Sequence, residues 1–144
     1  HLEIRLSKNG WKLIEINPRI SGGAMNKMIQ AAYGFSLVEE TLKIFVGEQP
    51  NLTPKHKQHV FTKYIISNQK GILEKVTGKG RASKSPGVVE VYIKPKKGTL
   101  IVPPLSMGHR YAYVIATGSS LEEAKTNANT AVAEIEFHLK AYEN

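Results

Sequence analysis

One short stretch of the chain combines side chains that could bind a metal ion and a phosphate group. Glu15, Asn17 and Arg19 alternate with other residues and are followed by the small residues 21–23. Because successive side chains of a strand point to opposite faces, the three polar groups would share one face. A carboxylate, an amide oxygen and a guanidinium at one edge suit a metal-and-phosphate site. The alternative is an amphipathic edge strand running into a turn, and residue types alone favour neither.

The segment before this strand supplies a second carboxylate. Residues 2–16 read as two alternating strands around a turn, which predicts a β-hairpin. A three-residue loop, residues 8–10, with a left-handed glycine would place Glu3 directly opposite Glu15. A two-residue loop at residues 9–10 would mix the two faces, so we reject it.

The two opposed carboxylates favour the metal-site interpretation. Like charges directly opposite each other destabilise a sheet unless a cation lies between them. Mg²⁺ takes oxygen ligands, often one or two carboxylates together with nucleotide phosphates. Glu3 and Glu15, with Asn17 two residues further on, provide such ligands. On the other face of the strand, Ile14 and Ile16 are expected to enter the core.

The motif Glu-Ile-Asn-Pro-Arg-Ile-Ser-Gly-Gly at residues 15–23 carries a family resemblance. With a hairpin-related glutamate before it, the motif resembles the end of an ATP-grasp catalytic domain, the fold of carboxylate–amine ligases, biotin carboxylase and carbamoyl phosphate synthase. It is most similar to the branch that includes L-amino acid ligases. A looser pattern at residues 108–124 is similar to the C-terminal domain of biotin-carboxylase-like members, so the resemblance covers most of the chain.

The resemblance implies roles for four side chains. Glu3, Glu15 and Asn17 would bind the Mg²⁺ ions that bridge the phosphates of ATP, with Mn²⁺ as a substitute. Arg19 would be catalytic, stabilising the transferred phosphoryl group and the acyl-phosphate. The implied cofactors are therefore ATP and Mg²⁺.

The resemblance also implies a substrate site after the arginine. Ser21, Gly22 and Gly23 would lie near the substrate, at the start of a helix whose free N–H groups favour a carboxylate or phosphate. Arg110 is a candidate contact to an anionic substrate, although we slightly favour the interpretation as a surface arginine at a strand start. For the methionines of the following helix, we expect core packing rather than a place in the pocket.

Several parts that the family needs are missing from the sequence. The glycine-rich loop over the ATP phosphates, the adenine-clamping lysine and the N-terminal substrate domain are not in these 144 residues. We therefore expect the chain to be the C-terminal portion of a larger enzyme and to be inactive by itself. The missing N-terminal part is then its first partner, and a small-molecule carboxylate and an amine are the others.

The implied function is that of an ADP-forming ligase, in which ATP phosphorylates a carboxylate and an amine then displaces the phosphate to form an amide or peptide bond. The alternative is a basic nucleic-acid-binding module, because the net charge is +8 and the pI is 9.7. The basic clusters at residues 79–84 and 94–97 lack interleaved aromatic side chains, so we interpret them as solvated hairpin tips and do not expect nucleic acid. A dimerisation role, giving a homodimer, is compatible with the ligase function.

The predicted fold class is α+β. Residues 1–48 would be the end of an ATP-grasp catalytic domain, a β-hairpin plus two helices. The first helix runs from Met25 to Gly34, and the second starts at a Ser36 capping box and ends at Phe45. Its buried stripe is expected to hold the apolar residues Val38, Leu42 and Phe45.

Residues 49–58 are predicted to be a linker, and residues 59–144 a small α+β domain. In that domain a small antiparallel sheet is covered by a long C-terminal helix from Leu121 to about Tyr142.

Composition excludes several classes of protein and of metal site. At 41% hydrophobic residues the chain can bury an ordinary core, and no apolar run is long enough to span a bilayer. The absence of cysteine excludes a disulfide framework and a cysteine metal site. We expect a cytoplasmic protein with no membrane partner.

Overall fold

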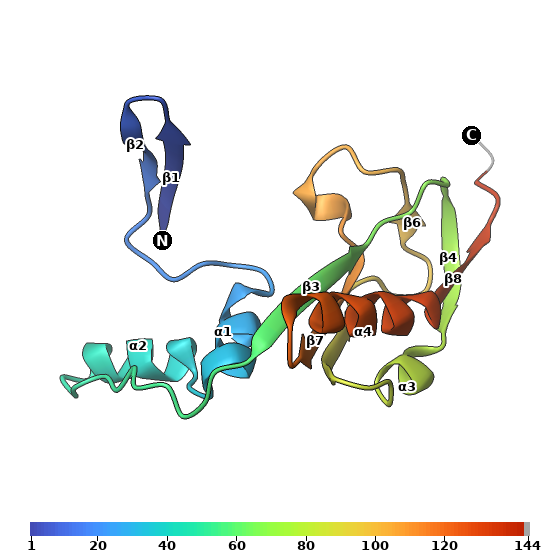
Figure 1. The fold of residues 1–144 in the computed structure, drawn as a ribbon. Helices are drawn as coiled ribbons and strands as arrows, with labels where there is room; N and C mark the ends of the chain where they lie inside the picture. Colours follow the sequence, from blue (N-terminus) through green and yellow to red (C-terminus); the bar gives the residue numbers. More distant parts are fainter. Residues whose placement is uncertain (143–144) are drawn as a thin grey trace.

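The computed structural model describes residues 1–142 and contains two differently built parts (Figure 1). The first part is a hairpin of β1 (Leu2–Ser7) and β2 (Gly10–Ile16), then α1 (Met25–Tyr33) and α2 (Leu37–Phe45). The second part, from residue 59, is an α+β unit of six strands and short helices. The α+β fold class is confirmed, and the last two residues of the expected domain, 143–144, lie outside the described residues.

The hairpin brings Glu3 opposite Glu15, as predicted, but its loop differs from the prediction. Ser7 pairs with Gly10, so the loop has two residues rather than three. The Ser7 hydroxyl explains the short loop, because it donates to the Gly10 carbonyl oxygen at 2.8 Å and accepts from the Asn9 amide at 3.2 Å. Gly10 has the predicted left-handed conformation, with φ of 87°.

A β-bulge restores the carboxylate pair that the shorter loop would have lost. Ile4 pairs with Leu13, whereas the preceding residue, Glu3, pairs with Glu15. Ile14 is therefore the one extra residue on β2, opposite no partner of its own. The register prediction was right about the pair and wrong about the loop, because one bulge residue replaces one loop residue.

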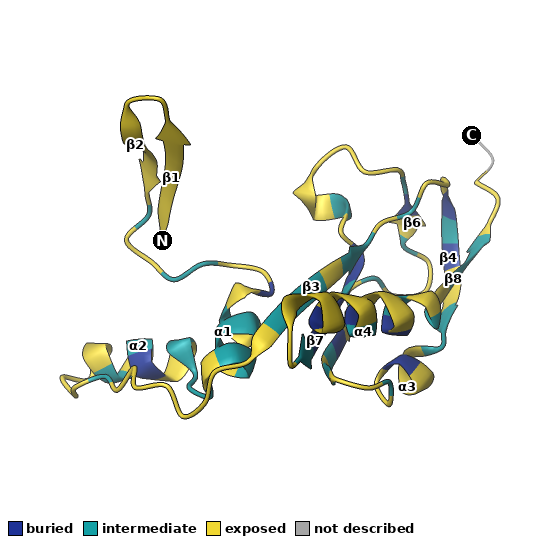
Figure 2. Ribbon diagram, viewed as in Figure 1, coloured by how far each residue is buried: buried dark blue, intermediate teal, exposed yellow. Residues whose placement is uncertain are grey.

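Two expectations about burial in the first part are wrong within the described structure. Ile14 and Ile16 are exposed, and so are Val38, Leu42 and Phe45 of α2. The hairpin stands away from the other described elements, and nearly all of its ribbon is exposed (Figure 2). Apolar side chains on both faces of β1 and β2 thus lack a covering layer among residues 1–142.

The two helices of the first part begin and end as predicted. Gly34 is left-handed and donates its N–H to the Gln30 carbonyl, which ends α1. Ser36 caps α2 by accepting from the Glu39 amide at 3.2 Å.

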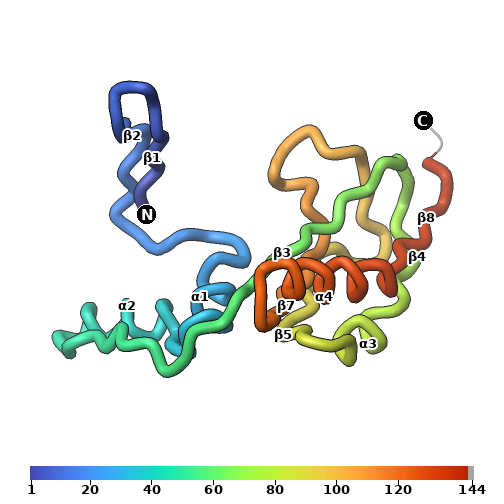
Figure 3. The backbone as a smooth tube through the Cα atoms, viewed as in Figure 1, coloured from blue at the N-terminus to red at the C-terminus, as the bar shows by residue number. Residues whose placement is uncertain are grey.

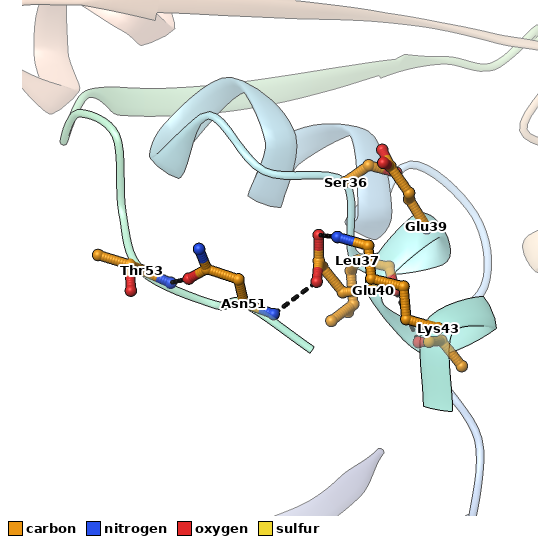
Figure 4. A network of polar contacts seen from close by, with 8 residues as sticks. Ser36, Leu37, Glu39, Glu40, Lys43, Asn51 and Thr53 are labelled. Carbon is orange, nitrogen blue, oxygen red and sulfur yellow. Dashed lines mark hydrogen bonds and ion pairs between the residues drawn. The ribbon is translucent and has the colours of Figure 1, made fainter. Parts of the chain in front are cut away.

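Glu40 ties α2 to the connection that follows it (Figure 4). One carboxylate oxygen accepts from Lys43 Nζ at 2.8 Å, and the other accepts from the Asn51 amide at 2.6 Å. The hydrogen bond from Lys43, and then that from Asn51, hold the pKa of the Glu40 carboxyl below its ordinary value of 4.5. Asn51 in turn accepts from the Thr53 amide at 3.0 Å, so this turn is fixed by side chains.

The core of the second part lies between a three-stranded antiparallel sheet and one helix. The strand order is β3 (His59–Ile65), β7 (Ala112–Gly118) and β5 (Val88–Ile93), with β7 in the centre. The helix α4 (Leu121–Ala133) crosses this sheet and packs mainly on β7 and β3. Small buried residues of α4 allow this close approach: Ala124, Ala128 and Ala131.

A second three-stranded sheet was not predicted. It contains β6 (Leu100–Ile101), β4 (Gly71–Thr77) and β8 (Glu136–Lys140), again antiparallel. Its buried cluster is Leu73, Ile101 and Tyr111. The prediction of one small sheet is therefore wrong, since the chain moves from one sheet to the other after β3 (Figure 3). The remaining elements are the four-residue α3 (Lys79–Ala82) and the 3₁₀ turn η1 (Met107–His109).

The predicted long helix is shorter than expected and is followed by a strand. It starts at the predicted Ser120 cap but ends at Ala133. The backbone of Gly78 approaches the end of α4 so closely that a Cβ built there would lie 1.6 Å from the Glu134 carbonyl oxygen. Beyond this contact β8 pairs with β4. Among the described residues, no helix combines the length and the apolar character needed to cross a membrane.

Candidate functional site

A cavity of about 470 Å³ lies where the hairpin base, the start of α1 and the sheet of the second part meet. We call it the site cavity. Its lining includes six of the residues that the sequence marked: Glu3, Arg19, Ser21, Gly22, Gly23 and Arg110. These residues come from β1, from the connection before α1 and from the connection between η1 and β7, so only the fold brings them together.

The other two marked residues, Glu15 and Asn17, lie on the hairpin and are not among the lining residues of the site cavity. Glu15 is the cross-strand partner of Glu3, and both side chains are exposed. In the part of the chain that the structure describes, neither carboxylate has an ion-pair partner. Two facing carboxylates and an amide oxygen two residues away are a hard-oxygen donor set, which fits a divalent cation such as Mg²⁺.

The connection from β2 to α1 is held by hydrogen bonds that its own backbone carbonyl oxygens accept. The Arg19 amide donates to the Asn17 carbonyl oxygen at 2.8 Å, and the exposed guanidinium of Arg19 donates to the Ile20 carbonyl oxygen at 3.1 Å. Asn26 in α1 donates its side-chain N–H to the Ser21 carbonyl oxygen at 2.8 Å. These contacts fix the backbone that the site cavity exposes.

Gly23 turns the chain into α1. It has a left-handed φ of 65°, which a side chain would oppose, and a Cβ there would meet the Tyr64 hydroxyl at 3.7 Å. The helix start is open to a ligand in one respect: its N-cap, Ala24, has no side chain that could accept from the first turn, and that turn has no acidic side chain. Free N–H groups there favour an anion.

Arg110 and Tyr64 form the opposite wall. The guanidinium carbon of Arg110 lies 4.5 Å from the centroid of the Tyr64 ring, a cation–π contact that orients the planar group. Tyr64 is the cross-strand partner of Tyr113, which is also the partner of Tyr92. The ring centroids are 5.9 and 5.1 Å apart, so a ladder of tyrosines supports the wall from behind.

Tyr113, in the middle of this ladder, is a structural group. Burial, and then the negative charge of Glu90, raise the pKa of Tyr113 to about 12. Its hydroxyl therefore stays protonated and donates to Glu90 Oε1 at 3.4 Å.

Sequence reasoning misjudged or missed five lining residues, and His1 is one of those that it did not mark. Met25 and Met28 were expected to pack in the core, but both line the site cavity, because α1 turns that face toward the hairpin base. Tyr64 and Met107 were not marked at all. The sequence offers one signal for Tyr64, its place in an apolar-alternating strand, but the stack with Arg110 depends on the pairing of β3 with β7.

The comparisons with known proteins point to one family. The family model described as L-amino acid ligase C-terminal domain 2 matches residues 63–140, more than half of the chain. The chain belongs to this family. The matched region of this ligase domain carries Tyr64, Met107 and Arg110, whereas the hairpin and α1 lie before it.

Relatives extend the similarity to the hairpin. The chain is 30% identical over 142 residues to the uncharacterised protein y4rH of Sinorhizobium fredii, covering 99% of this chain and 30% of y4rH. It is 29% identical over 102 residues to the L-arginine-specific L-amino acid ligase of Bacillus subtilis, covering 70% of this chain and 25% of that enzyme. The chain thus spans about a third or less of the length of these relatives.

Solved structures share the fold. The crystal structure of L-amino acid ligase from Bacillus licheniformis matches 98% of this chain and 36% of its own, with a TM-score of 0.75 at 18% identity. Phosphoribosylglycinamide synthetase from Anaerococcus prevotii matches 96% of this chain and 36% of its own, with a TM-score of 0.84 at 17% identity. These neighbours are ATP-grasp ligases, so the resemblance read from residues 15–23 is confirmed at the level of the family.

Proposed function

We propose that this chain is the C-terminal part of an ATP-dependent ligase that activates a carboxylate as an acyl-phosphate and joins it to an amine. One observation carries the proposal: residues from β1, the β2–α1 connection and the connection between η1 and β7 converge on the site cavity. Their groups are a carboxylate, two guanidinium groups and exposed backbone. Together these suit a reaction in which negatively charged phosphate and carboxylate groups must be held close together.

Glu3, Glu15 and Asn17 would hold Mg²⁺ on the hairpin. The ion would supply positive charge that neutralises the phosphates of ATP. The β-bulge at Ile14 matters here, because it sets the two carboxylates opposite each other despite the short loop.

Arg19 would bind the phosphoryl group during its transfer. Its guanidinium is exposed at the edge of the site cavity and makes one described hydrogen bond, to the adjacent Ile20 carbonyl. The group therefore keeps donors for a phosphate. A fixed positive charge beside the transferred group stabilises the charge that spreads over its oxygens in the transition state.

The substrate carboxylate would lie between the start of α1 and Arg110. The residues Ser21–Gly23 expose backbone to the cavity, and the first N–H groups of α1 add a partial positive charge. Arg110, held over the Tyr64 ring, offers a planar fork of donors that matches a carboxylate. The carboxylate would thus be bound on two sides before it is phosphorylated.

The partners follow from the same proposal. ATP, a small-molecule carboxylate and an amine would be the substrates, and the rest of the ligase would complete the nucleotide site. The same missing part would cover the apolar faces of the hairpin and α2, which have no covering layer among residues 1–142.

The test replaces one carboxylate in the complete ligase that contains this chain. Glu15→Gln should abolish ADP release while the circular dichroism spectrum and melting temperature stay near those of the wild type, because Glu15 is exposed. The matched control is Glu74→Gln, an exposed strand glutamate in the second sheet, which should keep full activity. Retained turnover in the Glu15 variant would refute the proposed metal role.

A further inference from the structure

The loop between β6 and β7 is closed at its base by one side chain. The Tyr111 hydroxyl donates to the Val102 carbonyl oxygen at 3.0 Å and accepts from the Val102 amide at 2.8 Å. Tyr111 is buried in the core of the second sheet. The base of the loop is therefore anchored to a rigid element.

The tip of the loop is held by His109. Its Nδ1 accepts from the amides of Leu105 at 3.0 Å and Ser106 at 3.2 Å, while the Ser106 hydroxyl accepts from the Gly108 amide at 3.2 Å. Because two donors face Nδ1, that nitrogen must be the unprotonated one, and this assignment follows from the hydrogen bonds. One imidazole thus bonds two successive backbone amides across the η1 turn.

Apolar packing contributes little to the tip. The Leu105 side chain is 86% exposed and that of Met107 is 73% exposed. Two further described contacts reach the turn: Lys94 Nζ donates to the Gly108 carbonyl oxygen at 3.4 Å, and the ring centroids of His109 and Tyr111 are 6.2 Å apart. The place of the tip therefore depends mainly on polar contacts, of which those of His109 are the shortest.

The tip lies at the site cavity. Met107, inside η1, and Arg110, which directly follows His109, both line it. Met25 and Met28 line the same cavity, so it combines Arg19 and Arg110 with three methionines. Methionine side chains adapt to irregular apolar groups, and a guanidinium binds a carboxylate.

We propose that His109 is a positioning residue that holds Met107 and Arg110 on the site cavity and so sets which substrate is accepted. The ligand class is an α-amino acid with an apolar side chain, whose carboxylate lies at Arg110 and whose side chain lies on the methionines. We call the two hydrogen bonds from the Leu105 and Ser106 amides to His109 Nδ1 the His109 lock. The ligand class rests on the proposed ligase function, whereas the His109 lock does not.

The first experiment tests the lock alone, in the 144-residue chain. Amide hydrogen exchange is measured by NMR at Leu105 and Ser106 in the wild type, His109→Leu and His109→Asn. The asparagine oxygen is as many bonds from Cβ as Nδ1, so His109→Asn should keep the protection of the wild type. In His109→Leu both amides should exchange at least about tenfold faster, as expected when hydrogen bonds of about 1 kcal/mol each are lost.

A control and a clear negative outcome accompany this measurement. His59→Leu removes an exposed imidazole at the start of β3 and should leave both amides as in the wild type. Unchanged exchange in His109→Leu would overturn the lock, whatever reaction the protein catalyses.

The second experiment measures kinetics in the complete ligase with L-leucine and L-serine as the carboxylate substrate. His109→Leu should raise KM for leucine about tenfold with little change in kcat, and should remove the preference for leucine over serine. His109→Asn should restore both. A fall in kcat at unchanged KM, or a preference for serine in the wild type, would overturn the substrate class. A wild-type enzyme with no ligase activity would instead refute the proposed function, while the exchange result would stand.

Discussion

Two isoleucines show how differently the two parts of the molecule are built. Ile14 in the hairpin is 60% exposed, whereas Ile115 in the central strand β7 is fully buried. Both lie in strands of antiparallel sheets, but β7 has strands on both sides and α4 across its sheet, while β2 has only β1. An isolated two-stranded hairpin is marginal in water, so the first part depends on a surface outside the described residues.

This difference divides the candidate site between a stable half and a dependent half. Tyr64 and Arg110 are supported by the second part, which has its own core. Glu3 and Glu15 are carried by the hairpin, whose pairing is its main support within residues 1–142. The wall of Tyr64 and Arg110 is therefore formed by this chain alone, whereas the proposed metal ligands lie on a hairpin that has no covering layer among residues 1–142.

The comparison is tested most strongly by removing each isoleucine side chain. Ile115→Ala should cost about 2–5 kcal/mol of unfolding free energy, because a buried cavity is left behind. Ile14→Ala should stay within about 0.5 kcal/mol, as for exposed sites. Urea unfolding of the 144-residue chain measures both, and similar losses would contradict the division into two parts.

Two left-handed glycines extend the comparison to the backbone. Gly78→Ala should cost about 2–4 kcal/mol, since the strain of a left-handed residue is joined by the clash with the Glu134 carbonyl oxygen. Gly10→Ala has the same kind of φ but open space within 4 Å, so only the strain of about 1–2 kcal/mol applies. Because the hairpin is a separate element, that cost should appear as loss of hairpin pairing by NMR and leave the main melting transition in place.

The smallest expected effect concerns Glu40. Its pKa is lowered in the folded chain, so the ionised carboxylate contributes stability above the ordinary value of 4.5, and this contribution is lost as the pH falls through the lowered folded value. Glu40→Gln should therefore loosen the α2–Asn51 contact at pH 7, seen as a shift of the Asn51 amide resonance. Below the lowered folded value, where wild-type Glu40 is also neutral, the two proteins should converge. The control is Glu39→Gln, an exposed neighbour; equal shifts in both variants would contradict the role of Glu40.

Local signals in the sequence were reliable. The Ser36 and Ser120 caps and the Gly34 terminus mark helix ends through bonds to residues three or four positions away, and each was predicted. The pair of Glu3 and Glu15 was also predicted, although the loop and the bulge were not. Which residues pair depends only on the total number of residues between them, in the loop and at the bulge together. The alternation of side chains between the two faces constrains that total.

Structural features that depend on contacts between residues far apart in the sequence could not be predicted from the sequence. Ile135 and Leu139 fit a helical stripe with Val132 and equally fit a strand with Phe137, and the contact of Gly78 with Glu134 decides between them. The split into two sheets and the stack of Arg110 on Tyr64 likewise join residues far apart in the sequence. Arg110 was marked by resemblance, whereas the place of Tyr64 in an alternating strand does not mark it as the partner of Arg110.

The bulge at Ile14 makes loop length and strand length interchangeable in this hairpin. A chain with one more loop residue and without Ile14 would present the same two carboxylates to each other, since the sum of the two lengths is what fixes their register. Insertions and deletions among related chains should therefore occur in compensating pairs, one in the turn and one at the bulge. An alignment that opens only one of the two gaps would misplace the second glutamate of the pair by one position.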